Sequence, residues 1–228
     1  MPQPSSHARR RRFTPLIAFA GLLSTALLAA ATTGVLSGFT ASITNSANSI
    51  STGTLLMQET GQSQTCLSTT ASTQIGGNAG VCATINKFGL ANTLSVPGSS
   101  YTTSITVKNI GSIPAASFTL TPSTCTQTTP AAGTGSNTAF CADVLISIED
   151  DTGTPSCLLG GTAGSACPAT PTATLASWST ALNLNATAGS VAPLASRIYK
   201  FTVQISGAAG NTDQGLAASE PLVWAFGS

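Results

Sequence analysis

The one run of acidic residues in the chain is the clearest candidate for metal chemistry. Glu149, Asp150 and Asp151 follow an alternating apolar segment. Calcium prefers several carboxylate oxygens, and Asp143 or Asp213 would add further ligands. The spacing does not match an EF-hand loop, and a solvated turn at a strand end is the better interpretation. We therefore treat these three residues as weak calcium candidates and otherwise expect no metal and no cofactor.

Six cysteines are the second group with possible chemistry. An even number of cysteines is typical of disulfide bonds formed in an oxidising compartment. The cysteines fall into three neighbouring couples, and no C-x-x-C pair is present, which argues against a thiolate zinc site. Each bridge would close a Ser/Thr/Gly-rich loop and restrict the unfolded chain. The favoured pairs are Cys66–Cys82, Cys125–Cys141 and Cys157–Cys167.

Residues for nucleophilic catalysis are scarce. The single histidine, His7, lies near the start of the chain, so the rest of the sequence has no histidine to activate a serine or to bind zinc. No G-x-S-x-G or S-x-x-K motif occurs. Trp178 and Trp224 are expected in the core rather than in a sugar-binding groove. We expect that the protein is not an enzyme, and a secreted hydrolase is the least favoured function.

The N-terminal residues resemble a secretory signal. Arg9–Arg12 form a basic cluster, and the apolar stretch Phe13–Leu36 follows, with small residues at its end. Cleavage after Ala31 or after Ser37 fits the small-residue pattern. The alternative is an uncleaved membrane anchor, because the stretch is long enough to span a bilayer. We expect residues 1–37 to be a signal peptide that is removed.

The remaining chain, residues 38–228, has the size of one domain. Its four basic residues, Lys87, Lys108, Arg197 and Lys200, face seven acidic residues and give a net charge of −3. Nucleic-acid binding requires clustered Lys and Arg, so a nucleic-acid partner is not expected. We expect a single secreted domain, extracellular or at the cell surface, with no membrane contact after cleavage.

Short alternating runs of apolar residues predict strands. Gly- and Pro-rich turns separate these runs, and two of them, around Ile105 and Phe118, are expected to be neighbouring strands. The loop over residues 152–172 holds a cysteine couple, and the loops over residues 60–81 and 121–140 each hold one cysteine and end next to its partner. The pattern predicts an all-β protein, an antiparallel jelly-roll-like β-sandwich with long disulfide-stapled loops and at most short helices. The strongest runs contain Leu55 and Met57, Ile105 and Val107, Phe118 and Leu120, Val144 to Ile148, Tyr199 to Ile205, and Leu222 to Phe226.

The first segment after the leader has an unusual apolar face for a chain terminus. Phe39, Ala41 and Ile43 alternate with Thr and Ser residues, which is the period of a strand. Residues 38–57 carry no charge. Such a strand either forms an edge of its own domain or is covered by a partner.

Three stretches resemble the TasA/camelysin-type secreted proteins. The segment "SGFTASITNSANSISTGTLLM" matches an aromatic-led start followed by a Ser/Thr-Gly-Thr-Leu stretch, through Phe39 and Ser51–Leu55. Near the end of the chain, Asn211, Gln214 and Gly215 match an Asn-x-x-Gln-Gly turn before a final strand. The stretch "TTSITVKNIGSIPAASFTL" is similar to the family's central hairpin. The cysteine-bearing loops are not part of this pattern.

The resemblance implies a jelly-roll-like sandwich that assembles into extracellular fibres of a biofilm matrix. In that assembly the N-terminal strand of one subunit, here Phe39, Ala41 and Ile43 within residues 38–57, completes the sheet of the next. Other matrix proteins are possible partners. Camelysin relatives have been labelled metallopeptidases, but this chain offers no zinc ligands for that activity. The alternative function is a monomeric cell-surface binding or adhesion module, which the same fold supports.

Overall fold

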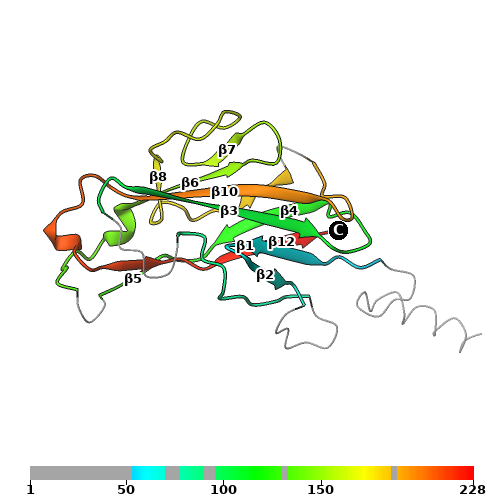
Figure 1. The fold of residues 1–228 in the computed structure, drawn as a ribbon, viewed down its shortest axis with the longest axis horizontal. Coiled ribbons are helices and arrows are strands. Elements are labelled where there is room, and N and C mark those ends of the chain that lie inside the picture. The colour runs from blue at the N-terminus through cyan, green and yellow to red at the C-terminus, as the bar shows by residue number, and fades with distance from the viewer. Residues whose placement is uncertain (1–52, 70–77, 90–95, 130–132, 186–188) are drawn as a thin grey trace, which may run out of the picture. The chain divides into compact units, whose positions relative to one another are not determined.

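The computed structural model describes residues 53–69, 78–89, 96–129, 133–185 and 189–228. Residues 53–228 form one compact unit made mainly of strands (Figure 1). The predicted signal peptide and the strand residues Phe39, Ala41 and Ile43 lie outside the described residues.

The largest sheet has seven antiparallel strands in the order β2-β1-β3-β10-β6-β7, with β8 also paired to β6. Its long central strands alternate as the sequence pattern predicts: Tyr199, Phe201 and Val203 on β10 are buried. The strands are β1 (Met57–Gly61), β2 (Gln64–Leu67), β3 (Ser100–Asn109), β6 (Val144–Asp150), β7 (Ser156–Leu159), β8 (Ala173–Thr174) and β10 (Ser196–Ile205).

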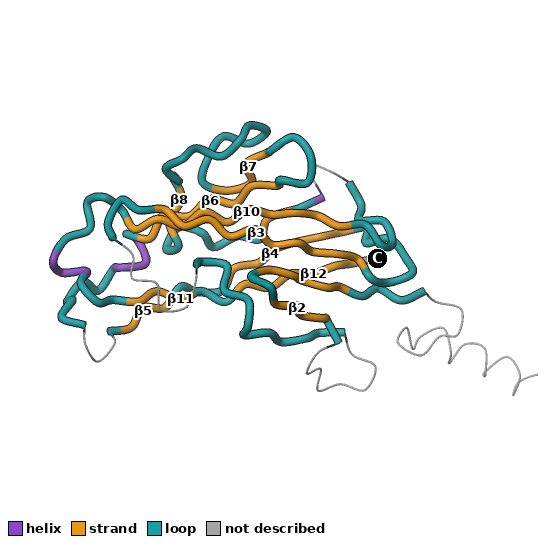
Figure 2. The backbone as a smooth tube through the Cα atoms, in the orientation of Figure 1, coloured by secondary structure: helices purple, strands orange, loops and turns teal. Residues whose placement is uncertain are grey.

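Two smaller antiparallel sheets complete the strand set (Figure 2). One has the order β12-β4-β9 and the other pairs β11 with β5. Two short 3-10 turns, η1 and η2, are also present. Among the described residues, no helix is long and apolar enough to cross a membrane. The elements are β4 (Ser117–Pro122), β5 (Thr126–Thr128), β9 (Leu182–Asn183), β11 (Ala217–Ser219), β12 (Leu222–Gly227), η1 (Phe140–Ala142) and η2 (Asn211–Asp213).

The prediction of an all-β, antiparallel fold is thus confirmed. Aromatic rings join the large sheet to the β12-β4-β9 sheet. The ring of Tyr199 lies 5.8 Å from that of Phe118 and 5.3 Å from that of Trp224, measured between centroids. Phe201 also contacts Trp224 at 6.0 Å. These contacts come from facing side chains of two sheets, and aromatic pairs at this spacing stabilise the packing. The jelly-roll-like connectivity stays a prediction.

The connection between β3 and β4 corrects the expectation that these strands are neighbours. β3 pairs with β1 and β10, whereas β4 pairs with β12 and β9 in the other sheet. Asn109, fully buried at the end of β3, donates through Nδ2 to the carbonyl oxygens of Ile113 (2.8 Å) and Val191 (3.0 Å). Its Oδ1 accepts a hydrogen bond from the Gly111 N–H (2.9 Å). These bonds turn the chain from one sheet to the other, so the segment is an arch and not a hairpin.

Three disulfide bonds are present, and they are the three neighbouring pairs that the spacing favours: Cys66–Cys82, Cys125–Cys141 and Cys157–Cys167. The loops that they close are more regular than expected. Cys66 lies in β2, Cys157 lies in β7, and Cys125 directly precedes β5. Each bridge therefore anchors a short strand.

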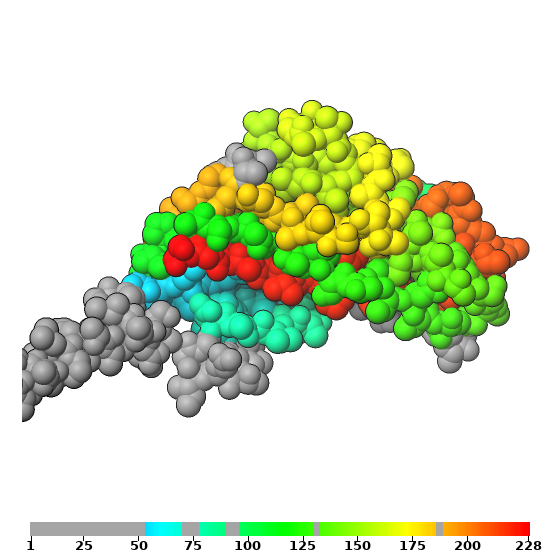
Figure 3. All heavy atoms as spheres, turned by 180° about the vertical axis from the view of Figure 1, so that it is seen from behind, coloured from blue at the N-terminus to red at the C-terminus, as the bar shows by residue number. Residues whose placement is uncertain are grey.

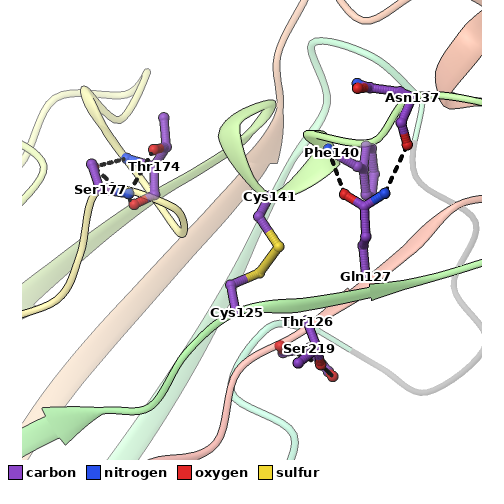
Figure 4. The surroundings of a disulfide bond; sticks show 9 residues. All are labelled: Cys125, Thr126, Gln127, Asn137, Phe140, Cys141, Thr174, Ser177 and Ser219. Carbon is purple, nitrogen blue, oxygen red and sulfur yellow. Dashed lines mark hydrogen bonds between the residues drawn. A yellow bond between two sulfur atoms is a disulfide. The ribbon is translucent and has the colours of Figure 1, made fainter.

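The Cys125–Cys141 bridge shows how such a loop is held (Figure 4). Beside it, the Gln127 side chain donates to the Asn137 carbonyl oxygen (2.7 Å) and accepts from the Phe140 N–H (2.7 Å). A covalent bond and two hydrogen bonds thus fix the segment before η1 to β5.

Candidate functional site

A cleft of about 630 Å³ runs along β12. One wall is formed by consecutive residues from Glu220 to Phe226. The opposite wall combines β1 and β2 with residues 78–88. Figure 3 shows β12 in red at the molecular surface, next to the blue-green segment around residues 78–89.

The cleft follows a strand edge that is unpaired in the part of the chain that the structure describes. Among the described residues, β12 pairs only with β4, and β2 is the outermost strand of the large sheet. The lining includes Trp224, which is half-buried, and Val223, which is exposed on the other face of β12. Because residues of both faces border the cleft, the edge itself is accessible there. An unpaired edge offers backbone N–H and C=O groups to an added strand.

The interior of the cleft is largely apolar. Its lining includes partly buried side chains that also pack against the hydrophobic core. An alternating strand would therefore find an apolar surface for one of its faces. These side chains are Leu55, Met57, Phe88, Leu222, Trp224 and Phe226.

A buried polar group links the two walls. Glu59 on β1 accepts a hydrogen bond from the Trp224 indole N–H through Oε1 (3.1 Å). The same oxygen lies 2.6 Å from the Lys87 ammonium, and both side chains are nearly buried. Lys87 also lies 6.0 Å from the centroid of the Trp224 ring, within the range of a cation–π contact. The carboxylate thus connects β1, the segment 78–89 and β12.

The segment 78–89 is fixed at two places. The Cys66–Cys82 disulfide ties it to β2. Gln62, in the hairpin turn between β1 and β2, donates through Nε2 to the carbonyl oxygens of Asn86 (2.7 Å) and Gly89 (3.1 Å). Gln62 and Ser63 both have positive φ, which is the backbone geometry of a two-residue hairpin turn. This wall of the cleft is therefore pre-formed.

Glu220 lines the cleft just before β12 and, unlike Glu59, has no hydrogen-bond partner among the described residues. Only 7% of the residue is exposed, and neither carboxylate oxygen has a hydrogen-bond partner among the described residues. Burial raises the pKa of Glu220 to about 7. A buried carboxylate without a partner is unfavourable in its charged form.

The calcium candidates have other partners in the structure. Glu149 lies 2.9 Å from the Lys200 ammonium, and Asp151 lies 3.5 Å from it. Asp150 accepts a hydrogen bond from the Thr152 N–H (3.0 Å). Glu149 and Asp150 are buried on β6, so the favoured interpretation of a solvated turn is wrong for these two residues. Across the described ranges, no three acidic, histidine or cysteine side chains are grouped as a metal site would require.

The sequence interpretation did not identify Glu59, Lys87 and Glu220 as site residues. One indication was available: between Phe13 and Asn86, Glu59 is the only charged residue. A lone charge inside a run that folds as a strand needs a partner once it is buried. Its partner Lys87 comes directly after Asn86, but the sequence does not show that the two residues pair, because the contact depends on tertiary structure. Glu220 has no comparable pattern around it.

No known protein family matches the chain, and no curated protein sequence matches it at a significant level. The likeness to TasA/camelysin-type proteins therefore rests on the short motifs alone.

Proposed function

We propose that this protein is a secreted structural subunit that assembles into extracellular filaments, as in a biofilm matrix. In each contact, the N-terminal strand of one copy, within residues 38–52, lies in the cleft of the next copy and pairs with β12. The observation that carries the proposal is the apolar cleft along the unpaired edge of β12.

The alternating apolar and polar residues at the start of residues 38–52 suit this cleft. Phe39, Ala41 and Ile43 would face the apolar lining, while Thr40 and Ser42 would face outward. The added strand would satisfy the free backbone groups of β12 and bury an apolar face that is otherwise exposed. Because donor and acceptor are different surfaces, the contact does not close on itself and propagates as a filament.

The three disulfides support an oxidising, extracellular setting. Such bridges make a subunit resistant to unfolding outside the cell. The proposal needs no catalytic group and no cofactor.

Deleting Gly38–Thr44 from the exported chain tests the proposal. We expect the deletion to abolish filaments seen by electron microscopy and to leave the thermal unfolding of the domain, followed by circular dichroism, nearly unchanged. The described strands do not include the deleted residues.

A matched pair of point variants tests the orientation of the strand. Ile43→Asp places a carboxylate in the apolar cleft and should prevent assembly, whereas Ser42→Asp places it outside and should be tolerated. Filaments that persist after the deletion would contradict strand addition. Unaltered protein that stays monomeric at all concentrations would favour the cell-surface binding module instead.

A further inference from the structure

Glu220 is the buried acidic group that the proposed assembly leaves unexplained. It lies at the start of β12, where the cleft begins, and both of its carboxylate oxygens are buried and unpartnered among the described residues. The other charged residues that line the cleft are Glu59 and Lys87, which pair with each other. Both oxygens are closed to solvent, so Glu220 meets a charged group from outside the described residues when its side chain turns into the cleft that it lines.

A buried carboxylate is best satisfied by a cation. The proposed incoming strand has no such side chain, because no Lys, Arg or His occurs from Phe13 to Asn86. Only alternate backbone N–H groups of that strand would pair with β12, and the remaining N–H groups carry no charge. One cation is left: the α-ammonium group that removal of the signal peptide creates at the new N-terminus.

We propose that Glu220 binds the α-ammonium group of the processed N-terminus of the neighbouring copy; this inference rests on the proposed function. The ion pair places the first residue of the incoming strand at the Glu220 end of the cleft. The strand then runs parallel to β12, from the Glu220 end toward Phe226. An unprocessed chain has an amide at this position and lacks the cation, so assembly is restricted to processed chains.

Two synthetic peptides of residues 38–48 test the ion pair, one with a free N-terminal amine and one N-acetylated. Both carry a C-terminal fluorophore, and their dissociation constants for the exported, monomeric protein are measured by fluorescence anisotropy near neutral pH. We expect acetylation to weaken binding at least about tenfold, a change that corresponds to about 1.4 kcal/mol. The difference should disappear in Glu220→Gln and persist in Asp151→Asn, an acidic residue that does not line the cleft.

The outcomes separate the two proposals. Equal binding of both peptides overturns the ammonium site and leaves strand addition intact. A difference that survives in Glu220→Gln also overturns the assignment, because the amine then contacts another group. If neither peptide binds, the proposed strand addition fails, and the inference fails with it.

Discussion

At the scale of single residues, the pKa values of two buried glutamates, Glu220 and Glu149, shift in opposite directions. Burial raises the pKa of Glu220 from its ordinary value of 4.5 to about 7. Burial acts in the same direction on Glu149, but hydrogen bonds from Lys200 and the Cys167 N–H, with the Lys200 charge, hold the pKa of Glu149 below its ordinary value. Among the residues that the structure describes, Glu220 thus has no hydrogen-bond partner, whereas Glu149 pairs with Lys200.

Glu220→Gln should change how the stability of the domain depends on pH. Between about pH 4.5 and about pH 7 the folded chain binds more protons at Glu220 than the unfolded chain, so the free energy of unfolding falls as pH rises. We expect the variant to match the unaltered protein near pH 4 and to exceed it by up to about 3 kcal/mol near pH 8. Urea unfolding at the two pH values measures the difference.

Glu149→Gln provides the control with the opposite sign. Because its pKa is lowered in the folded state, Glu149 contributes stability above about pH 4.5, and that contribution is lost as pH falls through the folded-state pKa. The variant should be less stable near pH 7 and approach the unaltered protein in acid. Identical pH profiles for the two variants would contradict the assignment of these pKa shifts.

At the scale of elements, the disulfide bridges have different relations to the cleft. Cys66–Cys82 holds the wall formed by residues 78–89, whereas Cys157–Cys167 connects β7 to the segment that follows it, away from the lining. Both bridges close loops of similar length, so their effects on the unfolded chain are comparable.

Replacing Cys66 and Cys82 together by serine should lower the free energy of unfolding by about 3 kcal/mol and also weaken assembly, because the wall loses its anchor. The same change at Cys157 and Cys167 should cost a similar amount of stability and leave assembly intact. Denaturant unfolding and filament imaging on both double variants distinguish the effects. Equal loss of assembly in both would show that stability, and not the cleft wall, controls it.

Several elements follow directly from the sequence, and others do not. The alternation of Tyr199, Phe201 and Val203 with polar residues predicts β10, because apolar residues at every second position lie on one face of a strand but not on one face of a helix. The arch after β3 was not predicted, since the residues around Gly111 suit a hairpin equally well. The buried Asn109 side chain favours the arch through its hydrogen bond to the carbonyl oxygen of Val191, a residue distant in sequence. The cleft was missed for the same reason: its walls come from separated segments.

At the scale of the whole molecule, the proposed assembly depends on processing. N-terminal sequencing of the exported protein should give a first residue between Thr32 and Phe39, because the apolar stretch ends there with small residues. Arg9–Arg12 still attached to protein in a membrane fraction would indicate an anchored protein and contradict this expectation.

The pairing of β12 with β4 also has a consequence for the order of folding. Leu222 pairs with Pro122, so the β12-β4 ladder joins residues that are far apart in the sequence. Such non-local contacts form slowly during folding, because a long loop must close first. On the proposed function, export proceeds from the N-terminus, so the segment proposed as donor would leave the membrane first and β12 would follow the other strands. The proposed docking surface would therefore not exist until the rest of the domain has been delivered. A chain in transit could not yet capture the strand of another copy, which would delay polymerisation until its export is complete.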